Sequence, residues 1–137
     1  MNADTPLALS LETRQREEFL DITVRVRQAL AKSGIESGLA VIFNPHTTAG
    51  LTINEGADPD VRRDILTTLA RLIPFHGDYR HAEGNSDAHV KASLMGSSVT
   101  IPVEKGKLQL GAWQAIYFCE FDGPRSRTVF LRFISAH

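Results

Sequence analysis

The chain has 137 residues, of which 42% are hydrophobic and 23% are charged, as in one globular domain, here residues 1–137, that can bury its own core. A formal net charge of -1 gives no basic field for nucleic acid, and the single cysteine, Cys119, excludes an intrachain disulfide and a thiolate metal cluster. No segment approaches the roughly 18 to 20 apolar residues of a membrane span, and residues 1–4 lack the basic start of a signal peptide, so we expect a cytoplasmic protein without membrane contact.

The first half of the chain predicts short strands around one helix. Leucines at every second position indicate an opening strand, and Asp21 can cap a helix that ends at Gly34. Residues 39–43 are continuously apolar, which predicts a strand buried on both of its faces. The strands predicted in this half cover residues 7–12, 19–20, 39–43 and 51–55.

The second half predicts two helices followed by a run of strands. Asp58 and Pro59 mark a helix start, and a polar loop over residues 75–86 separates this helix from a shorter one over residues 88–95. We expect Ser86 or Asp87 to cap the shorter helix. The predicted strands cover residues 99–103, 108–110, 113–121 and 128–134. Three helices with a strand-rich second half favour an α+β fold built on a largely antiparallel sheet.

Three of the five histidines lie where strand or helix patterns break into turns, namely His46, His81 and His89. Imidazole titrates near neutral pH and is a common ligand of transition metals, and a catalytic zinc uses three protein ligands with one open position. We therefore predict that the three share one polar site, with Glu83 and Asp87 as carboxylates that can orient an imidazole. Ordinary turn or surface histidines are the alternative, because the spacing matches no dedicated zinc signature.

Polar residues around the start of the third predicted helix suit an anion. Asn85 leads into a helix N-terminus, whose free N–H groups and dipole attract negative charge. The hydroxyls of Thr47 and Thr48 beside the first histidine can extend such a site, and so can Lys91 if its side chain turns inward. Simple helix capping explains the same residues without a ligand.

The connection before the last predicted strand carries two arginines, Arg125 and Arg127, close in sequence to Glu120 and Asp122. Guanidinium groups bind phosphate with two parallel hydrogen bonds, so this pair can contact a phosphorylated substrate. Solvated surface charge is the alternative. At the start of the preceding strand, we expect Trp113 to set the strand entry with its indole packed beneath it.

Longer motifs resemble one known family. The matching segments are residues 46–55, His81, and residues 88–96, 101–103, 110–114 and 120–127. In these segments the chain resembles the YjbQ-like family, whose members are also called secondary thiamine-phosphate synthases. The resemblance extends from about residue 7 to the end of the chain. Ala112 is a departure, since threonine or proline is expected there, and we expect the change to affect a turn rather than the chemistry.

The resemblance implies a compact α+β YjbQ-like domain that forms a homotrimer with a histidine-rich pocket. The implied activity joins hydroxymethylpyrimidine diphosphate to a thiazole phosphate, giving thiamine phosphate and pyrophosphate. The implied cofactor is a divalent metal, either zinc or another transition metal at the histidines or magnesium carried with pyrophosphate. The predicted catalytic residues are His46, His81, His89 and Asp87, the three histidines also being the metal ligands, and the predicted substrate contacts are Thr47, Thr48, Asn85, Lys91, Glu120, Arg125 and Arg127.

Two other functions use the same residues. A metal-assisted hydrolase of a small phosphorylated or acyl metabolite would turn over single substrates without coupling them. A binding protein for a metal or an anionic metabolite would bind tightly without turnover. The convergence of several titratable groups on one predicted pocket favours an enzyme over the binding protein.

Overall fold

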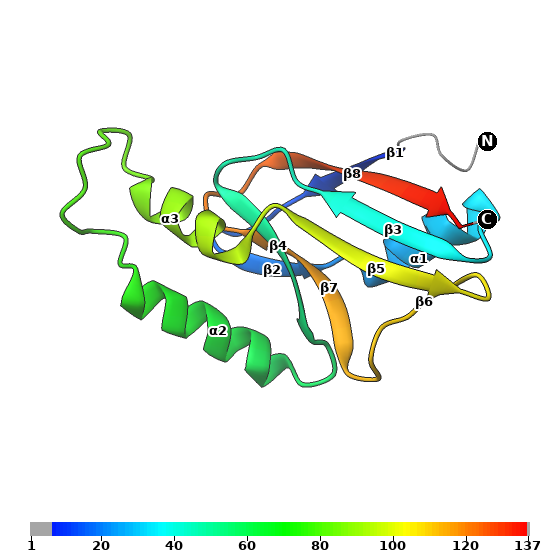
Figure 1. The fold of residues 1–137 in the computed structure, drawn as a ribbon. Coiled ribbons are helices and arrows are strands. Elements are labelled where there is room, and N and C mark those ends of the chain that lie inside the picture. The colour runs from blue at the N-terminus through cyan, green and yellow to red at the C-terminus, as the bar shows by residue number, and fades with distance from the viewer. Residues whose placement is uncertain (1–6, 137) are drawn as a thin grey trace.

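The computed structural model describes residues 7–136, which form two antiparallel sheets and three helices (Figure 1). The predicted α+β class is therefore confirmed. Residues 1–4, on which the expectation about a signal peptide rests, lie outside the described residues. The elements are β1 Leu7–Glu12, β2 Glu18–Asp21, α1 Thr23–Ser33, β3 Gly38–Phe43, β4 Ala49–Glu55, α2 Pro59–Leu72, α3 Ser86–Met95, β5 Ser98–Glu104, β6 Lys107–Leu108, β7 Gln114–Glu120 and β8 Ser126–Ser135.

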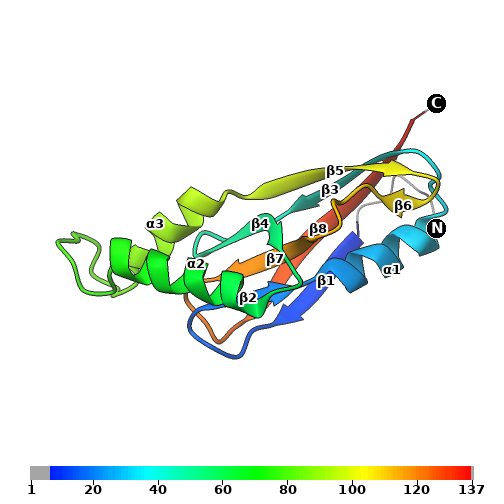
Figure 2. The same ribbon diagram turned by 90° about the horizontal axis from the view of Figure 1, so that it is seen from below.

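Strands distant in the sequence are neighbours in both sheets. The larger sheet has the order β1-β8-β3-β5-β6, and the smaller sheet has the order β2-β7-β4. Seen from below, α2 lies across the smaller sheet while α1 lies at the other end of the molecule (Figure 2). The chain therefore has a layer of helix against one sheet and a second sheet beyond it.

Strand β7 lies at the centre of the packing because both of its faces are buried. Ile116 and Phe118 point into the core shared with the larger sheet and α1, where both are fully buried. Tyr117 and Cys119 point to the opposite face, into a second core with α2 and α3. Alternate residues of one strand thus hold two hydrophobic cores together, as the period of two in a strand requires.

Strand β3 differs from its sequence prediction. Ala40 and Ile42 are fully buried, but Leu39 is 42% exposed and Phe43 is 45% exposed. The prediction of burial on both faces is therefore wrong for this strand. A continuous apolar sequence makes a strand hydrophobic, but it does not determine whether another element packs on each of its faces. In the single chain, nothing packs on the outer face of the larger sheet at these described residues.

The helix boundaries follow local chemistry, with one exception. Gly34 ends α1 with a φ of 73°, a left-handed conformation that favours glycine, and the Asp58 side chain caps α2 by accepting a hydrogen bond from the backbone N of Asp60. Asp21 lies one residue before the cap position of α1, yet its carboxylate accepts from the Thr23 backbone N at 2.9 Å. The predicted cap of the third helix is wrong, because α3 already begins at Ser86 and Asn85 occupies the cap position.

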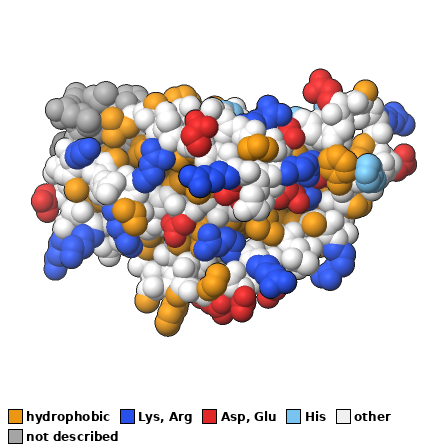
Figure 3. Space-filling view, turned by 180° about the vertical axis from the view of Figure 1, so that it is seen from behind, with side chains coloured by type: hydrophobic (Ala, Val, Ile, Leu, Met, Phe, Trp, Pro, Cys, Tyr) orange, Lys and Arg blue, Asp and Glu red, His pale blue; other side chains and the backbone are white. Residues whose placement is uncertain are grey.

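None of the helices in residues 7–136 is long and apolar enough to cross a membrane. On the face seen in Figure 3, acidic and basic side chains are interspersed, in keeping with the small net charge of -1. This face therefore has no extended region of positive charge that would attract a polyanion from a distance.

Candidate functional site

A buried ion pair joins two of the segments that the sequence singles out. The Nε atom of Arg127 donates to Oε1 of Glu120 at 2.8 Å, and Nη2 of Arg127 donates to the other carboxylate oxygen. The same Nη2 donates to the Thr48 hydroxyl at 2.9 Å, and the Thr13 hydroxyl donates to Oε1 of Glu120 at 2.8 Å. Solvated surface charge is thus the wrong description of Arg127, whose guanidinium ties the 120–127 connection to the turn that follows His46.

The pKa of Glu120 is held below its ordinary value. Burial by itself raises this pKa, but hydrogen bonds from Arg127, from the backbone N of Asp122 and from Thr13 outweigh the burial. The carboxylate is therefore ionised at neutral pH, and its charge neutralises that of Arg127 inside the protein.

A second, more exposed cluster connects the start of α3 to the same connection. Asp122 accepts from Nδ2 of Asn85 and from Nη2 of Arg125, both at 2.9 Å. The Arg125 side chain is 52% exposed, and its Nε donates to the backbone O of Asp122 at 2.7 Å. Arg125 therefore presents a fixed guanidinium to solvent beside the N-terminus of α3.

His46 is half-buried against strand β8 of the larger sheet. Its Nε2 lies 3.0 Å from both the backbone N and the backbone O of Thr128, and its ring packs edge-on against Phe118 with centroids 6.4 Å apart. Burial and the nearby positive charge of Arg127 lower the pKa of His46, although the Thr128 bond and Glu120 act in the opposite sense. At neutral pH the imidazole is uncharged and held in one orientation.

The turn before His46 contains a residue that sequence analysis missed. The Asn44 side chain is buried, accepts from the backbone N of His46 at 3.0 Å and donates to the backbone O of Ala49 at 2.6 Å. These bonds fix the turn over residues 44–49. The Asn-Pro sequence before the histidine carried the signal, because asparagine side chains commonly bond to nearby backbone in turns.

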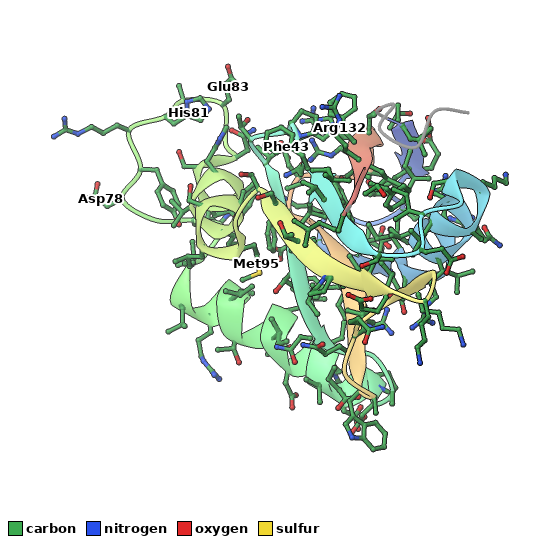
Figure 4. The ribbon with its side chains drawn as sticks, turned by 45° about the vertical axis from the view of Figure 1, so that its right-hand side comes forward. Phe43, Asp78, His81, Glu83, Met95 and Arg132 are labelled. Atoms are coloured by element: carbon green, nitrogen blue, oxygen red, sulfur yellow. The ribbon has the colours of Figure 1, made fainter. Side chains whose placement is uncertain are left out.

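His81 and His89 form a separate pair on the α2–α3 side of the molecule. Their ring centroids are 5.4 Å apart with the planes nearly perpendicular, and His81 Nε2 lies 3.7 Å from Oε2 of Glu83. Figure 4 shows His81 and Glu83 close together on the loop between α2 and α3, with Asp78 further round the same loop. These side chains lie at the surface.

The predicted three-histidine metal site is not assembled within one chain. Within residues 7–136, no three His, Cys, Asp or Glu side chains are grouped so that they could hold a metal ion. The physical reason is that the His46 ring bonds to the backbone of Thr128, whereas His81, on the loop before α3, packs against His89 in α3. The described residues of a single chain thus do not fit the implied transition metal.

Asp87 and Lys91 belong to a buried network rather than to the histidine pair. The carboxylate of Asp87 accepts from both terminal nitrogens of Arg16, at 3.0 and 3.2 Å, and from Lys91 Nζ at 3.0 Å. Lys91 also donates to Glu17 at 2.6 Å, and the Arg16 guanidinium lies 4.4 Å from the centroid of the Phe75 ring. Lys91 does turn inward, but its charge is used to join α3 to the segment between β1 and β2.

The pKa of Asp87 is lowered, so its carboxylate is ionised at neutral pH. Burial raises the pKa of this carboxyl, and the hydrogen bonds from Arg16 and Lys91 more than compensate. Asn85 lies at the start of α3, and Asp87 and Lys91 lie within this helix. Thr47, in contrast, is exposed at the turn beside Thr48.

We expect the free energy of unfolding to decrease as the pH falls below 6.5, the ordinary pKa of the imidazole, because unfolded His46 binds a proton more readily than folded His46 does. His46→Gln removes this contribution, so its unfolding free energy varies less with pH across that range. Urea titrations on either side of pH 6.5 measure the difference, with His76→Gln as the control at an exposed histidine. Identical pH profiles for wild type and His46→Gln would contradict the expectation.

The fold and the site define an α+β protein in which two packed sheets support an ionised polar cluster at one end. The chain belongs to the family described as UPF0047 protein YjbQ-like, whose sequence profile matches residues 8–136. Two relatives are YugU of Bacillus subtilis, 51% identical over 90% of this chain and 95% of that protein, and MJ1081 of Methanocaldococcus jannaschii, 52% identical over 90% of each. These matches cover the strands and helices that carry the site.

Solved structures agree with the fold. A YjbQ/UPF0047-family protein from Clostridium acetobutylicum superposes with a TM-score of 0.92 at 59% identity, covering 93% of this chain and 99% of that chain. A YbjQ-like protein of Sulfolobus solfataricus P2 also gives a TM-score of 0.92 at 32% identity, covering 96% of this chain and 97% of that chain. The family resemblance inferred from the motifs is confirmed.

Proposed function

We propose that the chain is a transferase that joins hydroxymethylpyrimidine diphosphate to a thiazole phosphate and releases pyrophosphate. The supporting observation is that hydrogen bonds join three distant segments at one end of the fold: the His46 turn, the start of α3 and the 120–127 connection. Each segment supplies residues predicted from the sequence to contact substrate. The activity was inferred from motifs that resemble those of the YjbQ-like family, and the chain is a member of that family.

The proposed reaction places most of its new charge on the leaving group. The bond between the pyrimidine methylene carbon and the diphosphate oxygen breaks, and a bond forms from the thiazole nitrogen to that carbon, so pyrophosphate departs with the electron pair. A fixed cation and a helix N-terminus both stabilise such a charge. Arg125 is the half-exposed cation here, held by Asp122 next to the start of α3.

The remaining residues differ in what they can do. Arg127 is already neutralised by Glu120, so we assign it to positioning Thr48 rather than to binding phosphate. His46 has a lowered pKa and stays neutral at pH 7, which suits a proton acceptor or donor near the reacting groups. His81 is exposed and His89 is partly exposed, so both can contact a substrate phosphate.

The test is a coupling assay that follows thiamine phosphate and pyrophosphate from the two precursors, with and without magnesium. We expect wild type to form product and Arg125→Gln to lower kcat/KM by about 100-fold, the scale of one lost charge-stabilising donor. Arg71→Gln, at an exposed arginine on α2, is the matched control and keeps full activity.

His89→Ala tests the histidine pair in the same assay. Loss of product in the folded variant supports a catalytic role, and retained activity removes it. Hydrolysis of either precursor without coupling would favour the hydrolase, and tight binding without turnover would favour the binding protein. In both cases the transferase proposal is wrong.

We also propose the homotrimer that the family resemblance implies. The supporting feature is the open outer face of the larger sheet, where β3 and β8 expose large apolar side chains in the single chain. Monomeric proteins seldom expose a continuous apolar face of this kind, so a partner is expected to cover it.

A further inference from the structure

The outer face of the larger sheet carries a regular apolar strip. Phe43 pairs with Phe130 at one end, and Leu39 pairs with Ile134 at the other, with exposed fractions between 42% and 45%. Between these pairs, Val41 lies opposite the exposed Arg132. Because these residues alternate with buried ones along both strands, they share one face of the sheet. We call these six residues the sheet strip, and Figure 4 labels Phe43 and Arg132 within it.

A second unpartnered feature lies at the turn before β7. Trp113 is 67% exposed, so the expectation that its indole packs beneath the strand is wrong. The turn is rigid, because Gly56 N donates to Trp113 O at 2.7 Å and Gly111 N donates to Oε1 of Gln114 at 2.8 Å. An exposed indole on a fixed backbone loses little entropy when it is buried by a partner.

The surroundings of Trp113 are hollowed and acidic. One hollow of about 410 Å³ is lined by Trp113 together with Glu55 and Asp58, and another of about 290 Å³ places Asp21 and Arg27 beside the same indole. Three carboxylates thus surround an aromatic side chain, with one arginine. We call Trp113 and these two hollows the tryptophan knob.

The sheet strip and the tryptophan knob are complementary in chemistry. The strip is apolar with one central cation, Arg132, and the knob is an exposed aromatic with a mainly acidic rim. In Figure 1, strands β3 and β8 lie on the upper side of the molecule, whereas the turn before β7 lies at its lower end. One chain therefore cannot join its own two surfaces, but each copy can offer its knob to the strip of the next.

We propose that the tryptophan knob of one copy docks on the sheet strip of the next copy, in a head-to-tail contact that closes into the proposed trimer. A cyclic assembly of three copies requires such a heterologous contact, in which two different surfaces meet. The inference rests on the proposed trimer and not on the transferase activity.

The docked knob also lies beside the candidate site. Phe43 precedes His46 by only three residues, and Phe130 follows Thr128, the backbone partner of His46, by two. The Trp113 turn of the neighbouring copy therefore forms one wall of the surface around His46. Each site is completed only when the ring is closed.

Two single variants and their mixture test the contact by light scattering after size exclusion. Wild type is expected at three times the 15.1 kDa of one chain, whereas Trp113→Asp and Phe130→Asp each shift to the mass of one chain. An equimolar mixture forms a species of two chains, because one intact knob then meets one intact strip. Leu72→Asp, at an apolar residue 69% exposed on α2, keeps the wild-type mass.

Arg132→Glu is the second route if an aspartate unfolds the sheet, since it changes a surface charge and keeps the apolar strip. It is expected to weaken association at least tenfold with an unchanged circular dichroism spectrum. A wild-type mass for Trp113→Asp, a mixture that stays monomeric, or a monomeric wild type overturns the proposal. Activity in the coupling assay is scored separately, so failure of the contact is distinguishable from failure of the transferase.

Discussion

Arg127→Met is expected to lower the free energy of unfolding by about 3 to 5 kcal/mol, the usual effect of removing one partner from a buried ion pair. The carboxylate of Glu120 is fully buried, and without the guanidinium its remaining donors among residues 7–136 are Thr13 and the backbone N of Asp122. Thr48 also loses the donor that fixes its hydroxyl. Urea unfolding at neutral pH, followed by fluorescence and circular dichroism, measures the change.

Two further variants separate the buried charge from the lost contacts. Glu120→Leu combined with Arg127→Met leaves no unpaired charge, so it is expected to recover most of the loss. Arg125→Gln breaks a half-exposed pair with Asp122, and it changes stability by less than about 1 kcal/mol. A loss as small as this for Arg127→Met would show that the Glu120 pair contributes no more than a surface pair.

Lys91→Met is expected to lower the free energy of unfolding by about 3 kcal/mol, because methionine keeps the apolar stem of the side chain but removes its charge. Lys91 is only 1% exposed and bonds to both Asp87 and Glu17. Asp87 keeps Arg16 as a partner, while Glu17 loses the only ion-pair partner found among the described residues. Lys107→Met, at an exposed lysine in β6, is the control and is expected to change stability by less than about 0.5 kcal/mol.

The same variant changes the acid limb of the stability curve. In the wild type, the lowered pKa of Asp87 means that its contribution is complete above the ordinary value of 3.8 and is lost as the pH falls further. Removal of Lys91 returns this pKa toward its ordinary value, so the acid-induced decrease in stability becomes shallower. An unchanged acid limb would show that Arg16 alone maintains the ionised carboxylate.

Local chemistry predicted where several elements begin and end. Leucines at every second position gave β1, Asp58 with Pro59 began α2, and Gly34 ended α1. These signals act within a few residues of each other, so one chain segment contains all the information they need. The start of α3 was misplaced because Asp87, a good capping residue by type, is drawn inward by Arg16 and Lys91 from distant and adjacent parts of the chain.

Sequence motifs selected the residues of the candidate site as a prediction, but they did not indicate how those residues are grouped. The motifs selected His46, Arg127 and Glu120, which lie in one cluster. They did not indicate that Glu120 neutralises the charge of Arg127 in a buried ion pair. The separation of His46 from the His81 and His89 pair also escaped the sequence, because residue type shows what a side chain can bind and not which neighbour it meets.

The amino-acid sequence by itself determined the family, the α+β class and the residue types available for chemistry, since motifs, strand alternation and helix signals are local properties of the chain. Only the tertiary structure decided which charges are neutralised inside the protein, which apolar faces stay open and which histidines are neighbours. These outcomes depend on contacts between residues as distant as Thr13 and Glu120 or Arg16 and Asp87, and such contacts exist only after both sheets and α3 have packed.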